Sequence, residues 1–570
     1  MNEAKEIAPE SRMTRVHTGA FLAGLFLLSL LSRLPLIFSP PTDYYYNLDE
    51  LSVTYAALDR FLGLPSTLLM LPSSFLQFFF LPLFLADMVI RRGLPLGSTA
   101  FLSELSLQLS HAYVDPHHTV LLMRCLAAVL SSAAPVLAYC VLDALGASRW
   151  AAILGAALVL FNPVFLQHSV MAGADAVAPT LALASVFCLL KTKGGGKFQY
   201  AGFLLAAGMA SRITVASFAS IPIIFLLVGD GATTWSERGK ALAFFGMGLV
   251  FGFLFWCPYV WIDPIRMAKA VYGNVNRPES YFDMRAFAEG WWQGMGAGFT
   301  VAWIVLFVAG CWMVFRYRSA LGLATLGGSL LISVPLALRA STVMPRYFLP
   351  LLPCLVLLLG VVASEISRRS LLRPAMKKSL FILLAVTAVL MAAECVERER
   401  EFRGPDDLNE ALKIIPSLPS GTVLYLPNWL VSEDRILLPR EACERLHAKL
   451  ADMTGVIQFA ESRGIPKNAA EILVTDLNEK EQAEAAHLAI ACRSAPEDSL
   501  KMYLYYQPGD YAIERSLADM SLEDALERVR TQKSSAIFVE GLHIPWATPF
   551  WKGKGDRFWY KGPESHPSSR

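Results

Sequence analysis

Long apolar blocks fill the first 395 residues of this chain and constrain its fold more than any other feature. The 570 residues are 54% hydrophobic and only 17% charged, whereas a soluble protein is about one quarter charged. About 20 consecutive apolar residues are enough for a helix to cross a bilayer. Blocks of this kind occur at 21–39, 120–143, 150–168, 176–190, 240–261, 299–315, 320–338, 347–364 and 379–394. With the two apolar segments discussed next, they predict a polytopic α-helical membrane protein with about 10 to 12 membrane helices.

Two further apolar segments have more than one interpretation. Residues 201–228 are too long for one ordinary helix and carry Arg212 near the middle, which favours a hairpin of two short helices. Residues 70–90 contain two prolines and either cross the membrane or lie along it. Short cytoplasmic loops are rich in Lys and Arg. The later basic loops share the side of the basic N-terminus only if 70–90 lies along the membrane, and we adopt that arrangement.

This topology divides the chain into four parts. We expect a cytoplasmic N-terminal segment at 1–20, a transmembrane module at 21–395 with a large outer loop at 40–119, an extramembrane domain at 396–560 and a disordered tail at 561–570. The extramembrane domain falls on the outer face, together with the large loop. The expected location of the whole protein is the bacterial inner membrane, with this domain on the periplasmic side.

The C-terminal region alternates short strand-like runs with helix-like runs. The alternation predicts an α/β domain with a largely parallel sheet. The expected strands are Thr422–Leu426, Ile472–Val474, Met502–Tyr506 and Ala536–Val539, and the expected helices are Glu441–Met453, Glu479–Cys492 and Leu522–Arg530. Whether Cys443 and Cys492 form a disulfide is left open by the sequence.

Acidic residues from distant parts of the chain converge on the predicted outer face. Asp49 and Glu50 follow the first span within a few residues and suit a general base or a divalent-cation ligand. Asp175 precedes the span at 176–190, in a region so apolar that an ionisable group there is costly unless it is functional. The alternative for the pair is a solvated loop, and for Asp175 it is a helix cap.

Two arginines reach the same face. Arg346 begins a late span, and Arg212 lies at the tip of the proposed hairpin. A guanidinium group makes paired hydrogen bonds to phosphate oxygens, so both are candidates for binding a lipid-linked phosphate. The alternative for Arg346 is an interfacial arginine whose head extends to the lipid surface.

Aromatic and amide side chains near these charges are candidates for sugar contact. They are Tyr46, Tyr272, Asn276 and Tyr281. Aromatic rings stack on sugars, although aromatic residues at a membrane interface are more often part of a belt.

Four motifs, in this order, resemble the GT-C integral-membrane glycosyltransferases, in particular the branch related to protein O-mannosyltransferases and aminoarabinose transferases. They are Asp49-Glu50 after the first span, the run Asp115-Pro116…Arg124…Tyr139…Asn162-Pro163…Ser169…Asp175, the run Gly202 to Arg212, and Arg346-Tyr347-x-x-Pro350. Together they extend over about residues 20–365. The resemblance implies Asp49 as the base, Glu50 and Asp175 as supporting acids, and Arg346 with Arg212 on the donor phosphate.

The resemblance also implies the reaction. Such enzymes take a sugar from a polyprenyl-phosphate donor and usually invert at the anomeric carbon, so we expect transfer to a lipid, glycan or protein acceptor, with no nucleic-acid partner. No cofactor is assigned, and metal dependence is left open because it varies among relatives. Two other classes stay open: a lipid or sugar transporter or flippase, and a membrane-anchored scaffold with an outer binding domain. The absence of any sequence repeat counts against the transporter.

Overall fold

The computed structural model forms two compact units, each described here by itself. One comprises Met1–Ser39, Asp49–Ser103 and His117–Arg403, and the other comprises Pro40–Leu48, Glu104–Pro116 and Gly404–Arg570. The residues that the structure describes are 10–38, 53–54, 57, 74–92, 117–191, 196–228, 234–262, 264–265, 284–317, 319–337, 345–369, 374–403, 423–427, 444–445, 501–506, 519–531, 536–539, 548–549 and 558–561.

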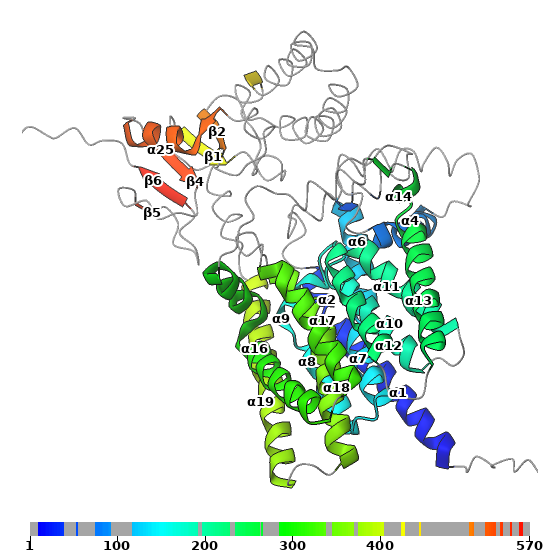
Figure 1. Ribbon diagram of the computed structural model, residues 1–570. Helices are drawn as coiled ribbons and strands as arrows, with labels where there is room; N and C mark the ends of the chain where they lie inside the picture. The colour runs from blue at the N-terminus through cyan, green and yellow to red at the C-terminus, as the bar shows by residue number, and fades with distance from the viewer. Residues whose placement is uncertain are drawn as a thin grey trace, which may run out of the picture. The chain divides into compact units, whose positions relative to one another are not determined.

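The first unit is a bundle of apolar helices, as expected for a polytopic membrane protein (Figure 1). Five described helical stretches are long and apolar enough to cross a bilayer: Thr18–Ile37, His118–Ala144, Trp235–Trp256, Met295–Tyr317 and Lys378–Arg398. Five shorter apolar helices accompany them at Arg149–Leu160, Val177–Lys191, Ile213–Val228, Ala320–Ser333 and Leu351–Ile366.

The helices of this unit begin and end near the predicted spans. They are α1 (Glu10–Leu31), α2 (Leu34–Ile37), α4 (Ser74–Arg92), α6 (His117–Ser131), α7 (Ala134–Ala144), α8 (Arg149–Leu160), α9 (Pro163–His168), α10 (Val177–Lys191), α11 (Gly196–Ser211), η1 (Ile213–Ala219), α12 (Ser220–Val228), α13 (Trp235–Trp256), α14 (Tyr259–Ile262), α16 (Met284–Tyr317), α17 (Ala320–Ala337), η3 (Pro345–Phe348), α18 (Leu351–Arg369) and α19 (Pro374–Arg403).

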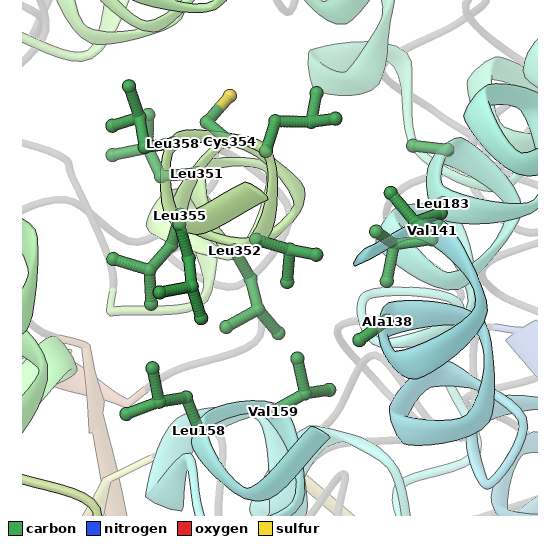
Figure 2. Packing of buried hydrophobic residues seen from close by; sticks show 14 of the residues in the cluster. Ala138, Val141, Leu158, Val159, Leu183, Leu351, Leu352, Cys354, Leu355 and Leu358 are labelled. Atoms are coloured by element: carbon green, nitrogen blue, oxygen red, sulfur yellow. The ribbon is translucent and has the colours of Figure 1, made fainter. Parts of the chain in front are cut away.

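α18 is the central helix of the bundle. Every residue from Leu351 to Ser364 is buried, and the helix packs against α7, α8, α10, α16 and α17. Figure 2 shows Leu352 and Leu355 on the side of α18 toward Leu158 and Val159 of α8, with Ala138 and Val141 of α7 beside the same helix. A helix that is apolar on all sides is stable only when it is enclosed. The uniformly apolar sequence of this span is therefore explained by its central position.

The helices outside α18 carry large apolar side chains on their exposed surfaces. Examples are Leu31 on α1, Phe251 on α13, Phe315 on α16 and Val389 on α19, all more than half exposed. In a soluble protein such a surface would aggregate, and in a bilayer it contacts lipid chains. The exposed surface of the bundle therefore agrees with a membrane location.

Small residues let α11 and α13 approach closely. A Cβ atom on Gly202 would overlap the Phe245 carbonyl oxygen, and one on Gly248 would overlap the Gln199 carbonyl oxygen. Glycine at such positions is the usual means of bringing two membrane helices into backbone contact. α13 itself begins at Trp235, earlier than predicted from apolarity, because Thr234 and Glu237 form a reciprocal capping box.

The segment at 201–228 breaks where the sequence predicts. α11 ends at Ser211, Arg212 adopts an extended backbone (φ −151°, ψ 115°), and η1 and α12 follow. A second break was not predicted. Gly296 has φ 72° and ψ 173° inside α16, and it divides that helix into two differently directed parts.

The described strands of the second unit form one six-stranded sheet in the order β3-β2-β1-β4-β6-β5. The strands β3, β2, β1 and β4 run parallel, as predicted, whereas β6 and β5 are antiparallel additions. Their bounds are β1 Val423–Pro427, β2 Lys501–Tyr506, β3 Met520–Ser521, β4 Ala536–Val539, β5 Thr548–Pro549 and β6 Phe558–Lys561.

One described helix covers part of this sheet. α25 (Leu522–Thr531) buries Leu522, Ala525 and Val529 together with Val423 and Tyr425 of β1. Ser521 opens the helix, because its hydroxyl accepts a 3.1 Å hydrogen bond from the Asp524 backbone N–H. The complete α/β domain stays a prediction, since much of 404–570 lies outside the described residues.

Two predicted boundaries differ from the structure. α19 continues beyond residue 395 to Arg403, so that its last turns are helical although their sequence is charged. β6 extends to Lys561, the first residue of the predicted disordered tail, because the strand pairs with β4 up to that residue. The runs Ile472–Val474 and Glu479–Cys492, as well as Cys443, lie outside the described residues.

Candidate functional site

Three chain segments that are far apart in sequence meet around one carboxylate. Asp175 lies in the turn between α9 and α10, Arg212 lies in the break after α11, and Arg346 lies in η3. The Nε atom of Arg212 is 3.0 Å from Oδ1 of Asp175, and the Nε atom of Arg346 is 3.9 Å from Oδ2. Nδ1 of His168 is 3.7 Å from the same Oδ2. We call these four residues the Asp175 cluster.

Local capping explains why the chain turns at Asp175. Asn162 accepts a 2.7 Å hydrogen bond from the Phe165 N–H and starts α9 with Pro163 at its first position. The helix ends after six residues, where the Ser169 hydroxyl donates to the Leu166 carbonyl at 2.6 Å. α10 then begins at Val177. Asp175 therefore projects from a short connection between two apolar helices.

Tyr347 lies next to both arginines of the cluster. The guanidinium carbon of Arg212 is 5.0 Å from the centre of its ring, and that of Arg346 is 5.8 Å from it. An arginine beside an aromatic face gains a cation–π interaction. Tyr347 thus limits the directions in which the two guanidinium groups can extend.

Burial makes the charges of this cluster strong. The side chains of Asp175, His168 and Arg346 are each 9–10% exposed, and that of Arg212 is 19% exposed. Burial by itself raises the pKa of Asp175, but the charges of Arg212, His168 and Arg346 together outweigh it, so the pKa lies below its ordinary value. Asp175 is therefore an anion at neutral pH.

The four residues of the cluster include two guanidinium groups and one carboxylate. Both arginines contact Asp175, and a third arginine, Arg398 of α19, lies near His168. Arginine does not lose its proton in proteins. The cluster therefore places two guanidinium groups, which bind anions such as phosphate, in a largely buried position.

Two polar atoms in the cluster make no hydrogen bond to the described residues. Within the described residues, Nδ1 of His168 and Oδ1 of Asp175 are enclosed and make no hydrogen bond. The 3.0 Å contact between Arg212 and Asp175 is thus an ion pair without the alignment of a hydrogen bond. Buried polar groups are normally paired, so these atoms are available to an incoming polar group.

The structure brings together three of the predicted site residues: Asp175, Arg212 and Arg346. The other six, Asp49, Glu50, Tyr46, Tyr272, Asn276 and Tyr281, lie outside the described residues. Sequence reasoning missed His168, Tyr347 and Arg398. His168 and Tyr347 both lie within the motifs that carry the family resemblance. For His168, a polar residue inside an apolar block was the signal that could have marked it as a site residue.

The charged partners of Asp175 come from other elements of the bundle. Its ion pairs are made to side chains of α9, the α11 break and η3 rather than to the first turn of α10. No group of three or more His, Cys, Asp or Glu that could hold a metal ion occurs in the part of the chain that the structure describes.

Comparison with known proteins agrees with the predicted resemblance. Residues 85–234 match the sequence model of the family described as dolichyl-phosphate-mannose-protein mannosyltransferase. The matched stretch contains three members of the cluster, His168, Asp175 and Arg212. The resemblance to this group of glycosyltransferases is therefore confirmed. No curated protein matches the chain closely enough to be assigned as a relative.

Solved structures of three proteins are similar at low sequence identity. The Archaeoglobus fulgidus oligosaccharyltransferase in the apo form is 12% identical, with 72% of this chain and 62% of that chain covered and a TM-score of 0.42. This chain therefore spans less than two thirds of the archaeal protein. ArnT from Cupriavidus metallidurans bound to undecaprenyl phosphate is 12% identical, with 97% and 98% covered and a TM-score of 0.43. The mycobacterial arabinofuranosyltransferase AftD is 14% identical, with 71% and 29% covered and a TM-score of 0.40.

Proposed function

We propose that this chain is a membrane glycosyltransferase that takes a sugar from a polyprenyl-phosphate donor. The acceptor is a lipid, a glycan or a protein at the outer face of the membrane. The observation that carries the proposal is the pair of largely buried guanidinium groups, Arg212 and Arg346, that meet beside Asp175 and suit the phosphate of such a donor. The matched family, whose description contains a dolichyl-phosphate sugar, supports the same substrate class.

The donor phosphate would bind between Arg212 and Arg346. Guanidinium groups make charge-assisted hydrogen bonds to phosphate oxygens, and these bonds are stronger where water is excluded. As the bond between the sugar carbon and the phosphate oxygen breaks, negative charge grows on the phosphate, and the arginines stabilise it. Asp175 would act through the arginines by fixing their direction, because it contacts both of them.

The acceptor would approach from the opposite side of the sugar. Asp49 is proposed to take the proton of the acceptor, with Glu50 supporting it, and attack opposite the leaving phosphate inverts the anomeric carbon. Tyr46, Tyr272, Asn276 and Tyr281 are proposed to contact the sugar. The C-terminal domain is proposed to lie on the outer face, where it takes part in acceptor selection.

Transfer of labelled sugar from a panel of polyprenyl-phosphate donors tests the proposal. The purified wild type is compared with Arg346→Ala, Asp175→Asn and Asp49→Asn. Arg316→Ala is the matched control, since Arg316 is an exposed arginine in the last turn of α16. We expect turnover by the wild type and the control, and loss of turnover in the three folded site variants.

The same measurement identifies the sugar through the donor that is used. Absence of turnover and of phosphate-lipid binding in the wild type would overturn the proposal. Turnover unaffected by Arg346→Ala would overturn the assignment of the phosphate to this cluster.

A further inference from the structure

Glu394, a partly buried residue of α19, has a carboxylate that bonds to another helix. It lies inside the apolar stretch Lys378–Arg398, in which charges are costly. Its Oε1 atom accepts hydrogen bonds from the backbone N–H groups of Ala297 (2.9 Å) and Gly298 (3.3 Å). Both donors belong to α16. Glu394 therefore bonds to the backbone of another helix, directly after the break at Gly296.

The break in α16 leaves N–H groups that the helix cannot satisfy. The first N–H groups of any helix have no partner within it, and its N-terminus carries partial positive charge. Beyond Gly296 a new helical part begins, and the Glu394 carboxylate supplies the acceptor and the opposite charge. This cap comes from a residue about 100 positions away in sequence, as the bond to Ala297 shows.

The glycines of the break fit this contact. A Cβ atom on Gly296 would overlap Oε2 of Glu394, and one on Gly298 would lie 2.6 Å from Cγ of Met391. Only glycine leaves room for α19 here, and the φ of Gly296 also requires it. The break and the cap are thus one arrangement.

The other side of the break holds an aromatic cluster. The Thr300 hydroxyl donates to the Gly296 carbonyl at 2.7 Å and accepts from the Trp291 indole N–H at 2.9 Å. The Trp291 ring lies 5.2 Å from the ring of Phe348, edge to face. Phe287, one turn earlier, lies 5.5 Å from the same ring.

Phe348 connects this cluster to the site. It is fully buried and belongs to η3, the single turn that carries Arg346 and Tyr347. The first part of α16 therefore packs on the turn that presents an arginine to Asp175, and the direction of that part depends on the break. A chain of contacts leads from Glu394 through the break, Trp291 and Phe348 to Arg346.

We infer that Glu394 is a positioning residue for the proposed transferase site. It caps the break in α16 and thereby fixes, through Trp291 and Phe348, the turn that holds Arg346 beside Asp175. The inference rests on the proposed function only for what Arg346 binds. Glu394 itself is not placed in contact with the substrate.

Binding of a short-chain polyprenyl phosphate without sugar tests the inference, with purified variants in detergent. Glu394→Ala removes the acceptor, and we expect the Kd to rise about 10-fold, because small misplacements of a binding group are costly. Glu394→Gln keeps a carbonyl oxygen for the two N–H groups, and we expect it to restore most of the affinity. Glu397→Ala, an exposed glutamate on the same helix, is the matched control and should bind as the wild type does.

A spectroscopic signal separates positioning from general loss of structure. Fluorotryptophan labelling gives a Trp291 resonance, assigned by its absence in Trp291→Phe. We expect the resonance to shift in Glu394→Ala and to stay near the wild-type position in Glu394→Gln. If Glu394→Ala does not fold, Thr300→Val removes the hydroxyl link at the same break and should shift the resonance and raise the Kd in the same direction.

The outcomes distinguish this inference from the proposed function. Normal phosphate binding in Arg346→Ala would overturn the assignment of the phosphate. Weak binding in Arg346→Ala together with wild-type binding in folded Glu394→Ala would overturn the inference alone. An unchanged Trp291 resonance in Glu394→Ala would overturn it whatever Arg346 binds.

Discussion

The helical path is interrupted at Arg212 and at Gly296, and the backbone at the two interruptions is accommodated differently. After α11 the chain leaves the helix at a residue with an ordinary extended backbone, and the side chain of that residue enters the Asp175 cluster. In α16 the chain leaves the helix at a glycine in the left-handed region, and a carboxylate from α19 satisfies the exposed backbone.

The difference teaches what a helix break can contribute to a membrane site. The first break supplies a functional side chain. The second break contributes no side chain, because glycine has none. It sets the direction of the first part of α16, and Glu394, Thr300 and Trp291 hold that geometry. Changes at the first break should therefore affect chemistry, whereas changes at the second should affect folding and alignment.

The largest expected effect is that of Arg212→Ala on the proposed transfer. A hydrogen bond to a charged group contributes about 1.5–3 kcal/mol, so we expect kcat/KM to fall by up to about 100-fold. Arg212→Lys should recover only part of the rate, because an ammonium group lacks the planar fork of guanidinium. Steady-state kinetics with the labelled donor measures both. Equal rates for the lysine variant and the wild type would contradict a fork-shaped contact.

Gly296→Ala should reduce stability instead. A residue with a Cβ atom at φ 72° costs on the order of 1–3 kcal/mol, and the Cβ atom also meets the Glu394 carboxylate. We expect a lower Tm in detergent.

The double variant Gly296→Ala/Glu394→Ala tests the coupling between the two residues. Removal of the carboxylate relieves the steric contact, so the two changes should destabilise by less than the sum of the single changes. Strict additivity would show that the carboxylate does not occupy the space beside Gly296.

The pH dependence of stability sharpens the comparison at Asp175. Its pKa is lowered in the folded protein, so its contribution to stability is present above the ordinary value near 3.8 and is lost as the pH falls through the lower folded value. We therefore expect Asp175→Asn to have a lower Tm than the wild type at pH 7. The difference should shrink below about pH 4. A difference that vanished already between pH 7 and 6 would contradict a lowered pKa.

The smallest effect is expected for an ion pair outside both breaks. Lys191 Nζ and Asp143 Oδ2 are 3.3 Å apart, and both side chains are about half exposed. Solvent screens such pairs, so Lys191→Ala should cost less than about 1 kcal/mol. The Tm of Lys191→Ala, measured together with that of Arg212→Ala, tests this expectation. A decrease in Tm as large as that of Gly296→Ala would contradict this interpretation.

Much of the helical bundle could be predicted from the sequence, because apolar runs of bilayer length have few alternatives in a membrane. The interruption at Arg212 could also be predicted, since a charged residue stands in the middle of an overlong apolar segment. The break at Gly296 could not, because glycine is common within membrane helices and the acceptor that stabilises the break comes from α19.

The sequence by itself determined that this chain is a membrane protein, where its apolar helices lie, and which charged residues are unusual enough to be functional candidates. Only the tertiary structure decided that Arg212 and Arg346 meet at Asp175, and that Glu394 stabilises a backbone in another helix. The physical reason is that the two kinds of interaction act over different separations along the sequence. Apolarity acts on each segment separately, whereas a buried charge is stable only beside a specific partner, and folding alone selects that partner.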